Sequence, residues 1–229
     1  EWAESAIADG RIGHIGFSFH DSPSALKEIV DGYDGWTFCQ VQYNYMDIAN
    51  PGQASEEGLR YAHSKGLAVV VMEPLLGGRL ANPPDAVRHL WESAPIERSP
   101  AAWGLLWLWD QPEVAVVLSG MSSMVQVEEN LATAEASAVG LLTDDDQTLV
   151  ARVRASFEEA TPIACTKCEY CMPCPNGVNI PRVFELFSLG KLHDDMDAMR
   201  REYARMPVES LADACQECRE CEEKCPQSI

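Results

Sequence analysis

The stretch "CQECRECEEKCP", Cys215–Pro226, decides the fold of the C-terminal part of the chain. Its cysteines follow the spacing C-x2-C-x2-C-x3-C-P, the bacterial pattern for cysteines that bind 4Fe-4S clusters. An earlier run, "CTKCEYCMPCP" at Cys165–Pro175, has the same form with one residue fewer in its last gap. Eight of the nine cysteines lie in these two runs. Because 4Fe-4S clusters transfer single electrons, the runs predict redox chemistry.

The spacing also predicts how two clusters would share the cysteines. Three cysteines separated by two residues each can surround one cubane, whereas the fourth cysteine of such a run commonly binds the other cluster. We therefore expect two 4Fe-4S clusters with crossed ligand sets. The first set is Cys165, Cys168, Cys171 and Cys225, and the second set is Cys174, Cys215, Cys218 and Cys221.

Zinc is the main alternative, because C-x2-C pairs also build four-cysteine zinc sites. Such sites use two pairs separated by a longer gap rather than runs of four that end in proline, so we favour clusters. Disulfides are less favoured, because we find no signal peptide and thiols in cytosolic proteins stay mostly reduced. We accordingly expect a cytoplasmic protein. The ninth cysteine, Cys39, lies in an apolar run and is expected to be a buried packing residue.

The 229 residues carry 36 acidic and 17 basic side chains, a formal net charge of −19. This excess argues against nucleic acid and anionic membrane surfaces as partners. It fits a basic or redox protein partner, and a solvated acidic surface that maintains solubility explains it equally well. No apolar run is long enough to span a membrane, since the stretch Trp103–Trp109 ends at Asp110. The chain starts at Glu1 rather than Met, so we expect either processing or a fragment of a longer protein.

Segments typical of strands and of helices alternate over the first part of the chain. The expected strands are 12–19, 36–43, 67–72 and 114–118. The expected helices are 22–33, 55–65, 84–93, 100–109 and 124–136, the first of them with Ser22 before Pro23 as a start signal. Strict alternation predicts right-handed β–α–β units and a parallel sheet. An open four-stranded sheet and half of an eight-stranded βα barrel both fit this pattern.

The pattern changes after Leu142, where we place a domain boundary. Thr143 and Asp146 predict a capping box, and the helix behind it leads into the first cysteine run. The apolar positions of the helices expected in this part are Leu149, Val153 and Phe157, then Val183, Leu186 and Phe187, then Met196, Met199, Tyr203 and Met206. We expect the methionines to serve in packing rather than in metal binding. The expected domains are therefore residues 1–142 and a mostly helical cluster domain at 143–229.

Four stretches of the first part are similar to a known family. "GRIGHIGFSFH", "FCQVQYNY", "VVVMEPLLGGRL" and "LSGMSSMVQVEENL" resemble, in order and spacing, strands five to eight of an aldo-keto reductase barrel. The segment Cys165–Ile229, with "CTKCEYCMPCPNGVNIP", resembles the 4Fe-4S ferredoxin-like extension of a bacterial and archaeal branch of that family. The resemblance implies an α/β fold: the C-terminal half of a (β/α)8 TIM barrel followed by a mostly α-helical dicluster ferredoxin-like domain.

The family uses nicotinamide cofactors, so the resemblance also implies an NAD(P)H site. Ser18 and Gln40 match residues that hold the nicotinamide carboxamide, whereas the asparagine that follows the serine in the family is Phe19 here. Met72 stands where many members stack an aromatic ring on the nicotinamide. The other implied contacts are Leu75, Gly77 and Arg79 over the pyrophosphate, and Ser122, Gln126, Glu129 and Asn130 at the adenosine end.

Simpler interpretations of these residues exist. Without the family, Gln126 and Glu129 fit an exposed helix face, and Ser18 and Gln40 fit polar side chains that are satisfied inside a barrel. No Lys or Arg stands at the positions that usually hold a 2′-phosphate, which favours NAD over NADP.

The resemblance implies no catalytic residue in this chain. The family's catalytic Asp, Tyr, Lys and His come from strands one to four, and the similarity begins at strand five. His20 ends the first expected strand, where barrel chemistry takes place, although a structural role is the more common one for such a histidine. The edge strands of a half barrel invite pairing, so we expect an N-terminal half, a second copy or a partner chain to complete the sheet.

Two functions fit these expectations. The first is an NAD(P)H-dependent oxidoreductase that reduces a small carbonyl or related substrate, with the clusters supplying or removing electrons. The second is an electron-transfer module, in which the barrel part is a docking surface and the clusters relay electrons between redox protein partners. Binding of NAD(P)H separates the two. A zinc-stabilised interaction protein is the third possibility, and it would be colourless rather than brown.

Overall fold

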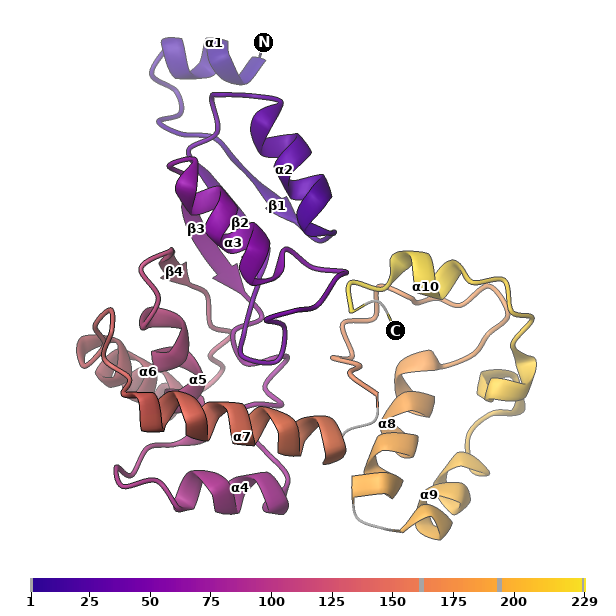
Figure 1. The fold of residues 1–229 in the computed structure, drawn as a ribbon. Coiled ribbons are helices and arrows are strands. Elements are labelled where there is room, and N and C mark those ends of the chain that lie inside the picture. Colours follow the sequence, from indigo (N-terminus) through magenta and orange to yellow (C-terminus); the bar gives the residue numbers. More distant parts are fainter. Residues whose placement is uncertain (1, 161–162, 193–194, 228) are drawn as a thin grey trace. The chain divides into compact units, whose positions relative to one another are not determined.

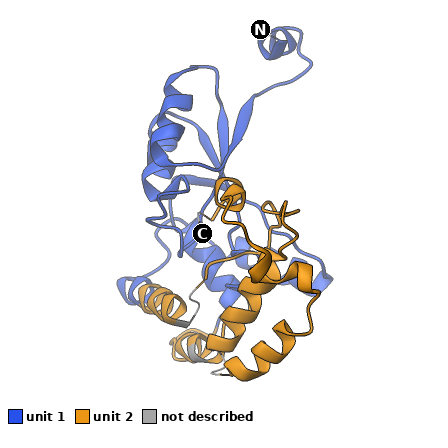
Figure 2. Ribbon diagram, turned by 90° about the vertical axis from the view of Figure 1, so that its right-hand side faces the viewer, with its two compact units in different colours: residues 1–81, 98–148 blue, residues 82–97, 149–229 orange. Residues whose placement is uncertain are grey.

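The structure, a computed structural model, describes residues 2–160, 163–192, 195–227 and 229 (Figure 1). The chain divides into two compact units, residues 1–81 with 98–148 and residues 82–97 with 149–229 (Figure 2). None of the described helices combines the length and the apolar character needed to cross a membrane.

The first unit is built on a parallel sheet of four strands in the order β1-β2-β3-β4. The strands are β1 (Gly16–Phe19), β2 (Phe38–Gln42), β3 (Ala68–Met72) and β4 (Val114–Val117). Their register sets one row of side chains across the sheet, since Ser18 pairs with Gln40, Gln40 with Val70, and Val70 with Val116. The predicted parallel sheet is therefore confirmed.

The helices α2, α3 and α5 of this unit lie between successive strands in the chain, and Figure 1 shows α2 and α3 along one face of the sheet. Ser22 and Ser99 start two of them, because each hydroxyl accepts the N–H of the residue three positions later, at 3.4 Å from Ala25 and at 3.0 Å from Ala102. The helices are α1 (Trp2–Ala8), α2 (Pro23–Asp31), α3 (Ser55–Ser64), α5 (Pro100–Trp109) and α6 (Met124–Glu135).

The two faces of the sheet differ in burial. Cys39, Val41, Val69 and Val71 alternate along β2 and β3 and are all 0% exposed, as expected for the face that carries the helices. The opposite face contains the row described above. There Gln40 and Val70 are half-buried, Ser18 is exposed, and Val116 is 46% exposed. The first unit thus has one packed face and one open face.

The second unit is helical. In it α8 and α9 pack closely, because a Cβ at Gly190 would lie 2.5 Å from the sulfur of Met196 and 3.1 Å from Cγ of Met199. These two methionines therefore serve in packing, as expected. Its elements are α4 (Asp85–Glu92), residues 149–160 of α7 (Asp144–Ala160), α8 (Ile180–Leu192), α9 (Met196–Tyr203), two 3-10 turns (Val208–Ser210 and Ala212–Ala214) and α10 (Glu220–Lys224).

The capping box predicted before α7 is present. The Thr143 N–H and hydroxyl both donate to Asp146 Oδ2, at 3.0 and 2.8 Å, and the Asp146 N–H donates back to Thr143 Oγ1 at 3.2 Å. The expected apolar side of this helix is buried, since Leu149, Val153 and Phe157 are 7%, 0% and 3% exposed.

The start of the first strand differs from the prediction. The strand was expected from Ile12, but β1 begins at Gly16. The N–H groups of Arg11 and Ile12 instead donate to the Ala6 carbonyl, at 2.9 and 3.3 Å, and so close the end of α1. The short helix α1 itself was not predicted.

Gly16 is required where β1 meets β2. A Cβ there would lie 2.5 Å from the carbonyl oxygen of Phe38 and 2.5 Å from its ring. We expect Gly16→Ala to lower the free energy of unfolding by about 1 to 3 kcal/mol, because the strands would have to separate. Urea denaturation followed by tryptophan fluorescence measures this. Gly13→Ala is the matched control, since a Cβ at Gly13 meets no atom within 4 Å. Equal effects of the two substitutions would contradict the explanation.

Candidate functional site

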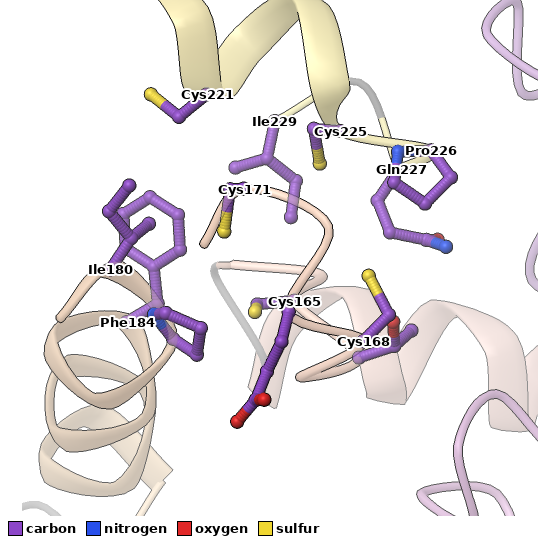
Figure 3. A pocket seen from close by; sticks show the side chains of 13 residues that line it. Cys165, Cys168, Cys171, Ile180, Phe184, Cys221, Cys225, Pro226, Gln227 and Ile229 are labelled. Atoms are coloured by element: carbon purple, nitrogen blue, oxygen red, sulfur yellow. The ribbon is translucent and has the colours of Figure 1, made fainter. Parts of the chain in front are cut away.

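Two cavities in the second unit gather the eight cysteines of the two runs. The first encloses about 450 Å³, its open mouth included, and the second about 670 Å³. The cysteines that line the first cavity are Cys165, Cys168, Cys171, Cys221 and Cys225 (Figure 3). Those that line the second are Cys171, Cys174, Cys215, Cys218 and Cys221.

The cavities reproduce the crossed grouping expected from the spacing. Cys225, from the second run, lines the cavity of the first run, and Cys174, from the first run, lines the cavity of the second. Cys171 and Cys221 border both cavities. Each cavity is therefore lined by three cysteines of one run and the last two cysteines of the other.

The two cysteine loops share an unusual backbone conformation. Lys167 and Glu169 flank Cys168 with φ values of 58° and 65°, and Glu217 and Arg219 flank Cys218 with 54° and 64°. Non-glycine residues rarely adopt this left-handed conformation, which costs on the order of 1 kcal/mol each. Turns of this kind direct successive backbone N–H groups to one side and occur at many iron–sulfur sites. One such contact is present, from the Glu217 N–H to Cys215 Sγ at 3.4 Å.

The chemistry of the first cavity fits a group with sulfur acceptors. Thr166 lines this cavity, and its hydroxyl is buried with no hydrogen-bond partner among the described residues. Burial raises the pKa of the Cys171 thiol, and the nearby Cys165, Cys168 and Cys225 raise it further. Iron binding at Cys171 would therefore have to displace the proton of that thiol.

The arrangement of the thiols favours a cluster over zinc. Each cavity is lined by five cysteines of the two runs, one more than the four ligands that a structural zinc ion takes.

In the first unit, three of the residues expected at the nicotinamide lie side by side on the open face. The Gln40 amide donates to Ser18 Oγ and to Met72 Sδ, both at 3.4 Å (β1, β2 and β3 each contribute one residue). Ser18 and Met72 lie at or near the carboxyl ends of their strands, the edge at which βα folds bind ligands. Phe19 belongs to the opposite face and is 5% exposed, so it offers no polar contact there.

The loop after β3 is a compact turn. Leu76, Gly77 and Gly78 have φ values of 50°, 62° and 84°, and the Leu80 N–H donates to the Leu75 carbonyl at 3.1 Å. Arg79 lies half-buried in this turn. The loop thus brings together all three residues expected over the pyrophosphate, namely Leu75, Gly77 and Arg79.

The residues expected at the adenosine end lie around the first turns of α6. Gln126 has a structural role there that was not predicted, because its Oε1 accepts the N–H groups of Ser122 and Ser123, at 2.8 and 3.2 Å, in a capping box. The pattern S-x-x-Q at 123–126 was the signal for it. Asn130 donates to Ser119 Oγ at 3.0 Å, and the Glu129 carbonyl accepts the Thr133 hydroxyl at 2.8 Å.

His20 has an acidic neighbour at the same sheet edge. Burial lowers the pKa of His20, and the Glu73 carboxylate partly opposes this change. Glu73 directly follows β3, has a φ of 53°, and accepts the Asn44 amide on its carbonyl at 3.0 Å. Sequence analysis did not single out Glu73, although its position just after a buried strand was the available signal.

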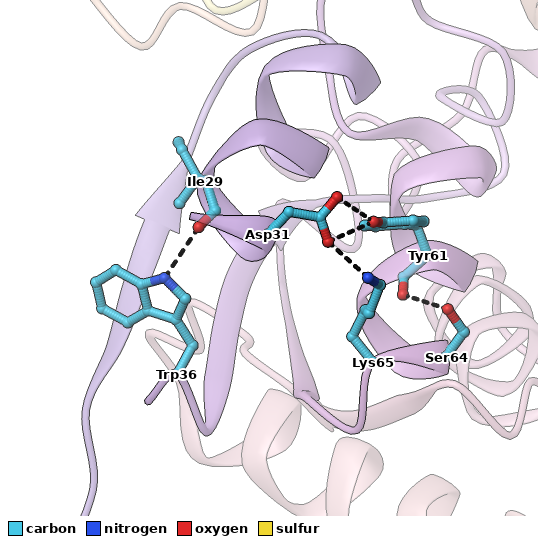
Figure 4. Close-up of polar contacts among 6 residues, drawn as sticks. All are labelled: Ile29, Asp31, Trp36, Tyr61, Ser64 and Lys65. Atoms are coloured by element: carbon cyan, nitrogen blue, oxygen red, sulfur yellow. Dashed lines mark hydrogen bonds and ion pairs between the residues drawn. The ribbon is translucent and has the colours of Figure 1, made fainter. Parts of the chain in front are cut away.

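The ionic cluster between α2 and α3 serves the fold instead (Figure 4). Asp31, the last residue of α2, accepts the Tyr61 hydroxyl at 2.6 Å and the Lys65 ammonium at 2.6 Å. These donors, Lys65 first, lower the pKa of Asp31. The contact joins two helix ends on the side where the strands begin, the side of such folds that is associated with stability.

An α/β sheet with polar side chains at its carboxyl edge, joined to a unit with two cysteine-lined cavities, defines an α/β protein with an iron–sulfur domain. The sequence model of the Aldo/keto reductase family matches residues 3–153, and that of the 4Fe-4S dicluster domain matches residues 164–229. The chain belongs to the aldo/keto reductase family and carries a 4Fe-4S dicluster domain. The family and the 4Fe-4S domain inferred from the sequence are therefore confirmed.

Solved structures and a curated relative agree with this membership. An aldo-keto reductase of Bacillus halodurans in its holo form is 26% identical, with a TM-score of 0.53 over 66% of this chain and 53% of that one. An aldo-keto reductase of Klebsiella pneumoniae in complex with NADPH shares the fold at 20% identity, with a TM-score of 0.51 over 66% and 51%. An uncharacterized oxidoreductase of Schizosaccharomyces pombe is 29% identical over 126 residues, 55% of this chain and 38% of that protein. The chain therefore spans about half the length of these solved relatives and 38% of the yeast protein.

Cys39 lies outside both cavities, and its burial raises the pKa of the thiol to about 11. At pH 8 about one Cys39 in a thousand would carry the reactive thiolate, against roughly a quarter of unfolded cysteines. We expect iodoacetamide to modify Cys39 at least about a hundredfold more slowly in the folded chain than in urea. Peptide mass spectrometry measures the two rates. Rates within a few-fold of each other would show that Cys39 is not buried.

Proposed function

We propose that this chain is part of an NAD(P)H-dependent oxidoreductase that reduces a small carbonyl compound and exchanges electrons with two 4Fe-4S clusters. The observation that carries the proposal is the grouping of eight cysteines around two cavities, each completed by a cysteine of the other run. Family membership and the polar row at the carboxyl edge of the sheet support the nicotinamide part.

The spacing of the two runs and the lining of the two cavities support the following ligand sets. We assign Cys165, Cys168, Cys171 and Cys225 to one cluster, and Cys174, Cys215, Cys218 and Cys221 to the other. When bound, the clusters supply single-electron transfer. The chain contributes the thiolates, the left-handed loop residues that direct N–H groups toward them, and the Thr166 hydroxyl beside the first set.

The nicotinamide would lie on the open face of the sheet. Ser18 and Gln40 can hydrogen-bond a carboxamide there, and Gln40 is already oriented by its contacts with Ser18 and Met72. The Met72 thioether can pack against the ring. The loop of Leu75, Gly77 and Arg79 would cover the pyrophosphate, with Ser122, Gln126, Glu129 and Asn130 at the adenosine end. Residues 119–130 contain no Lys or Arg, which favours NAD over NADP.

We further propose that β1 to β4 correspond to strands five to eight of the family barrel, with the barrel part ending near Leu142. Three observations support this: the strands follow one another in order across the sheet, the chain spans about half of its solved relatives, and the face carrying Val116 is open. The missing half, on the same polypeptide or on another chain, would cover that face and pair with β1 and β4. It would also supply the catalytic residues.

The cluster assignment is tested by metal analysis of protein purified without oxygen. We expect about eight irons and eight sulfides per chain, and an EPR spectrum of two interacting clusters after reduction with dithionite. Cys225→Ser should lower the iron content to about four, because it removes a ligand of the first set only. Cys39→Ser is the control and should keep about eight. Zinc in place of iron, or loss of both clusters in Cys174→Ser and neither in Cys225→Ser, would contradict the assignment.

Nucleotide binding separates this proposal from the second candidate, an electron-transfer module with a non-catalytic barrel part. The apolar Phe19 and the use of the Gln126 oxygen in the helix cap favour that candidate. For the enzyme, we expect NADH to bind to the protein with its completed barrel, and Gln40→Leu to weaken binding about tenfold through the loss of hydrogen bonds. Fluorescence titration measures this, with Gln216→Leu, an exposed amide of the cluster domain, as control. No binding of NADH or NADPH would favour the relay.

A further inference from the structure

Each crossing cysteine is followed, two residues later, by a carboxamide. Cys174 is followed by Pro175 and Asn176, and Cys225 by Pro226 and Gln227. This repeat is separate from the ligand spacing, since neither carboxamide is a cluster ligand. Both side chains are hydrogen-bond donors, and both come from the segment that leaves its own loop to reach the other cavity.

Asn176 reaches a cysteine of the opposite run. It lines the cavity of Cys174, Cys215 and Cys218, and its Nδ2 donates to Cys218 Sγ at 3.9 Å. In this structure the acceptor is a thiol, and in the cluster-bound form it would be a thiolate, which accepts more strongly. Lys224, a basic side chain in electrostatic contact with Cys218, is itself paired with Glu220 at 3.0 Å. Asn176 is thus a neutral donor aimed at this sulfur.

Gln227 occupies the corresponding place in the first cavity. It is 8% exposed and lines the cavity together with Cys165, Cys168 and Cys225. Figure 3 shows its carboxamide on the side of the cavity that carries Cys168, the second cysteine of the first run. Cys218 is the second cysteine of its run, as Cys168 is of the first, so each carboxamide lies near the second cysteine of the opposite run.

We propose that Asn176 and Gln227 set the reduction potentials of the two clusters, each acting on the cluster bound by the crossing cysteine that precedes it. This proposal rests on the clusters proposed above. Reduction adds negative charge to a cluster and its thiolates, and a hydrogen bond to a ligand sulfur stabilises that charge. Each carboxamide therefore raises the potential of one cluster, and neither acts as a catalytic residue.

The test is a redox titration of the anaerobically purified chain, followed by EPR and visible absorption. Asn176→Leu keeps the approximate size and removes the donor, and Asn176→Asp keeps the shape and adds a negative charge. We expect both to lower one midpoint and leave the other unchanged. For the leucine variant, a change of about tenfold in the ratio of reduced to oxidised cluster corresponds to about 59 mV. Gln227→Leu should lower the other midpoint, and Asn176→Gln should restore part of the loss.

Gln216→Leu is the matched control, because Gln216 lies in a cysteine loop but lines neither cavity. It should leave both midpoints unchanged. Unchanged midpoints in fully loaded Asn176→Leu and Gln227→Leu chains would overturn this proposal and leave the cluster assignment intact. Loss of a cluster in both Asn176→Leu and Asn176→Asp would also overturn it, since the residue would then be needed for assembly. Absence of clusters from the unsubstituted chain would overturn the proposed function as well.

Discussion

Each cysteine run contributes its last cysteine to the cavity of the other run, and the second unit depends on this exchange. A cavity completed by Cys225 cannot form unless the second loop returns to the first, about fifty residues away in sequence. The helices α8 and α9 make that return, and their close contact at Gly190 keeps it short. The residues on either side of Cys168 and Cys218 have a left-handed backbone conformation, which the residues of a free loop would rarely adopt. The crossed arrangement of the two loops provides a reason for them to persist.

The exchange was predictable because ligand spacing is a local, chemical signal. The same is true of helix starts such as Ser22 and Ser99, where a side chain caps a backbone three residues away. The prediction failed where backbone groups had competing partners. The N–H of Ile12 donates to the end of α1, a helix that was not predicted from the sequence. The strand therefore begins later, at Gly16. Local sequence patterns thus predict the features that local contacts determine, such as helix caps. They do not predict which of two possible hydrogen-bond partners a backbone group will take.

The residues expected to bind the nicotinamide cofactor were predicted less completely than the cysteine ligands. Register across parallel strands accounts for the meeting of Ser18, Gln40 and Met72, which the sequence indicated only through the resemblance to the family. The sequence placed Gln126 shortly after the end of the fourth expected strand. Its role in the capping box could be predicted only by considering it together with Ser123. Glu73 was missed because a carboxylate next to a histidine at a sheet edge becomes visible only when two distant loops are brought together.

The distance between Cys171 and Cys225 also has a consequence for biosynthesis. On the ribosome the first three cysteines of one ligand set are made about fifty residues before the fourth, and Cys174 is made before any of its three partners. Neither set is complete until synthesis has passed Cys221, so a chain that stalls between the runs offers only incomplete sites. With the proposed ligand sets, a complete cluster site exists only in chains whose translation has passed both loops.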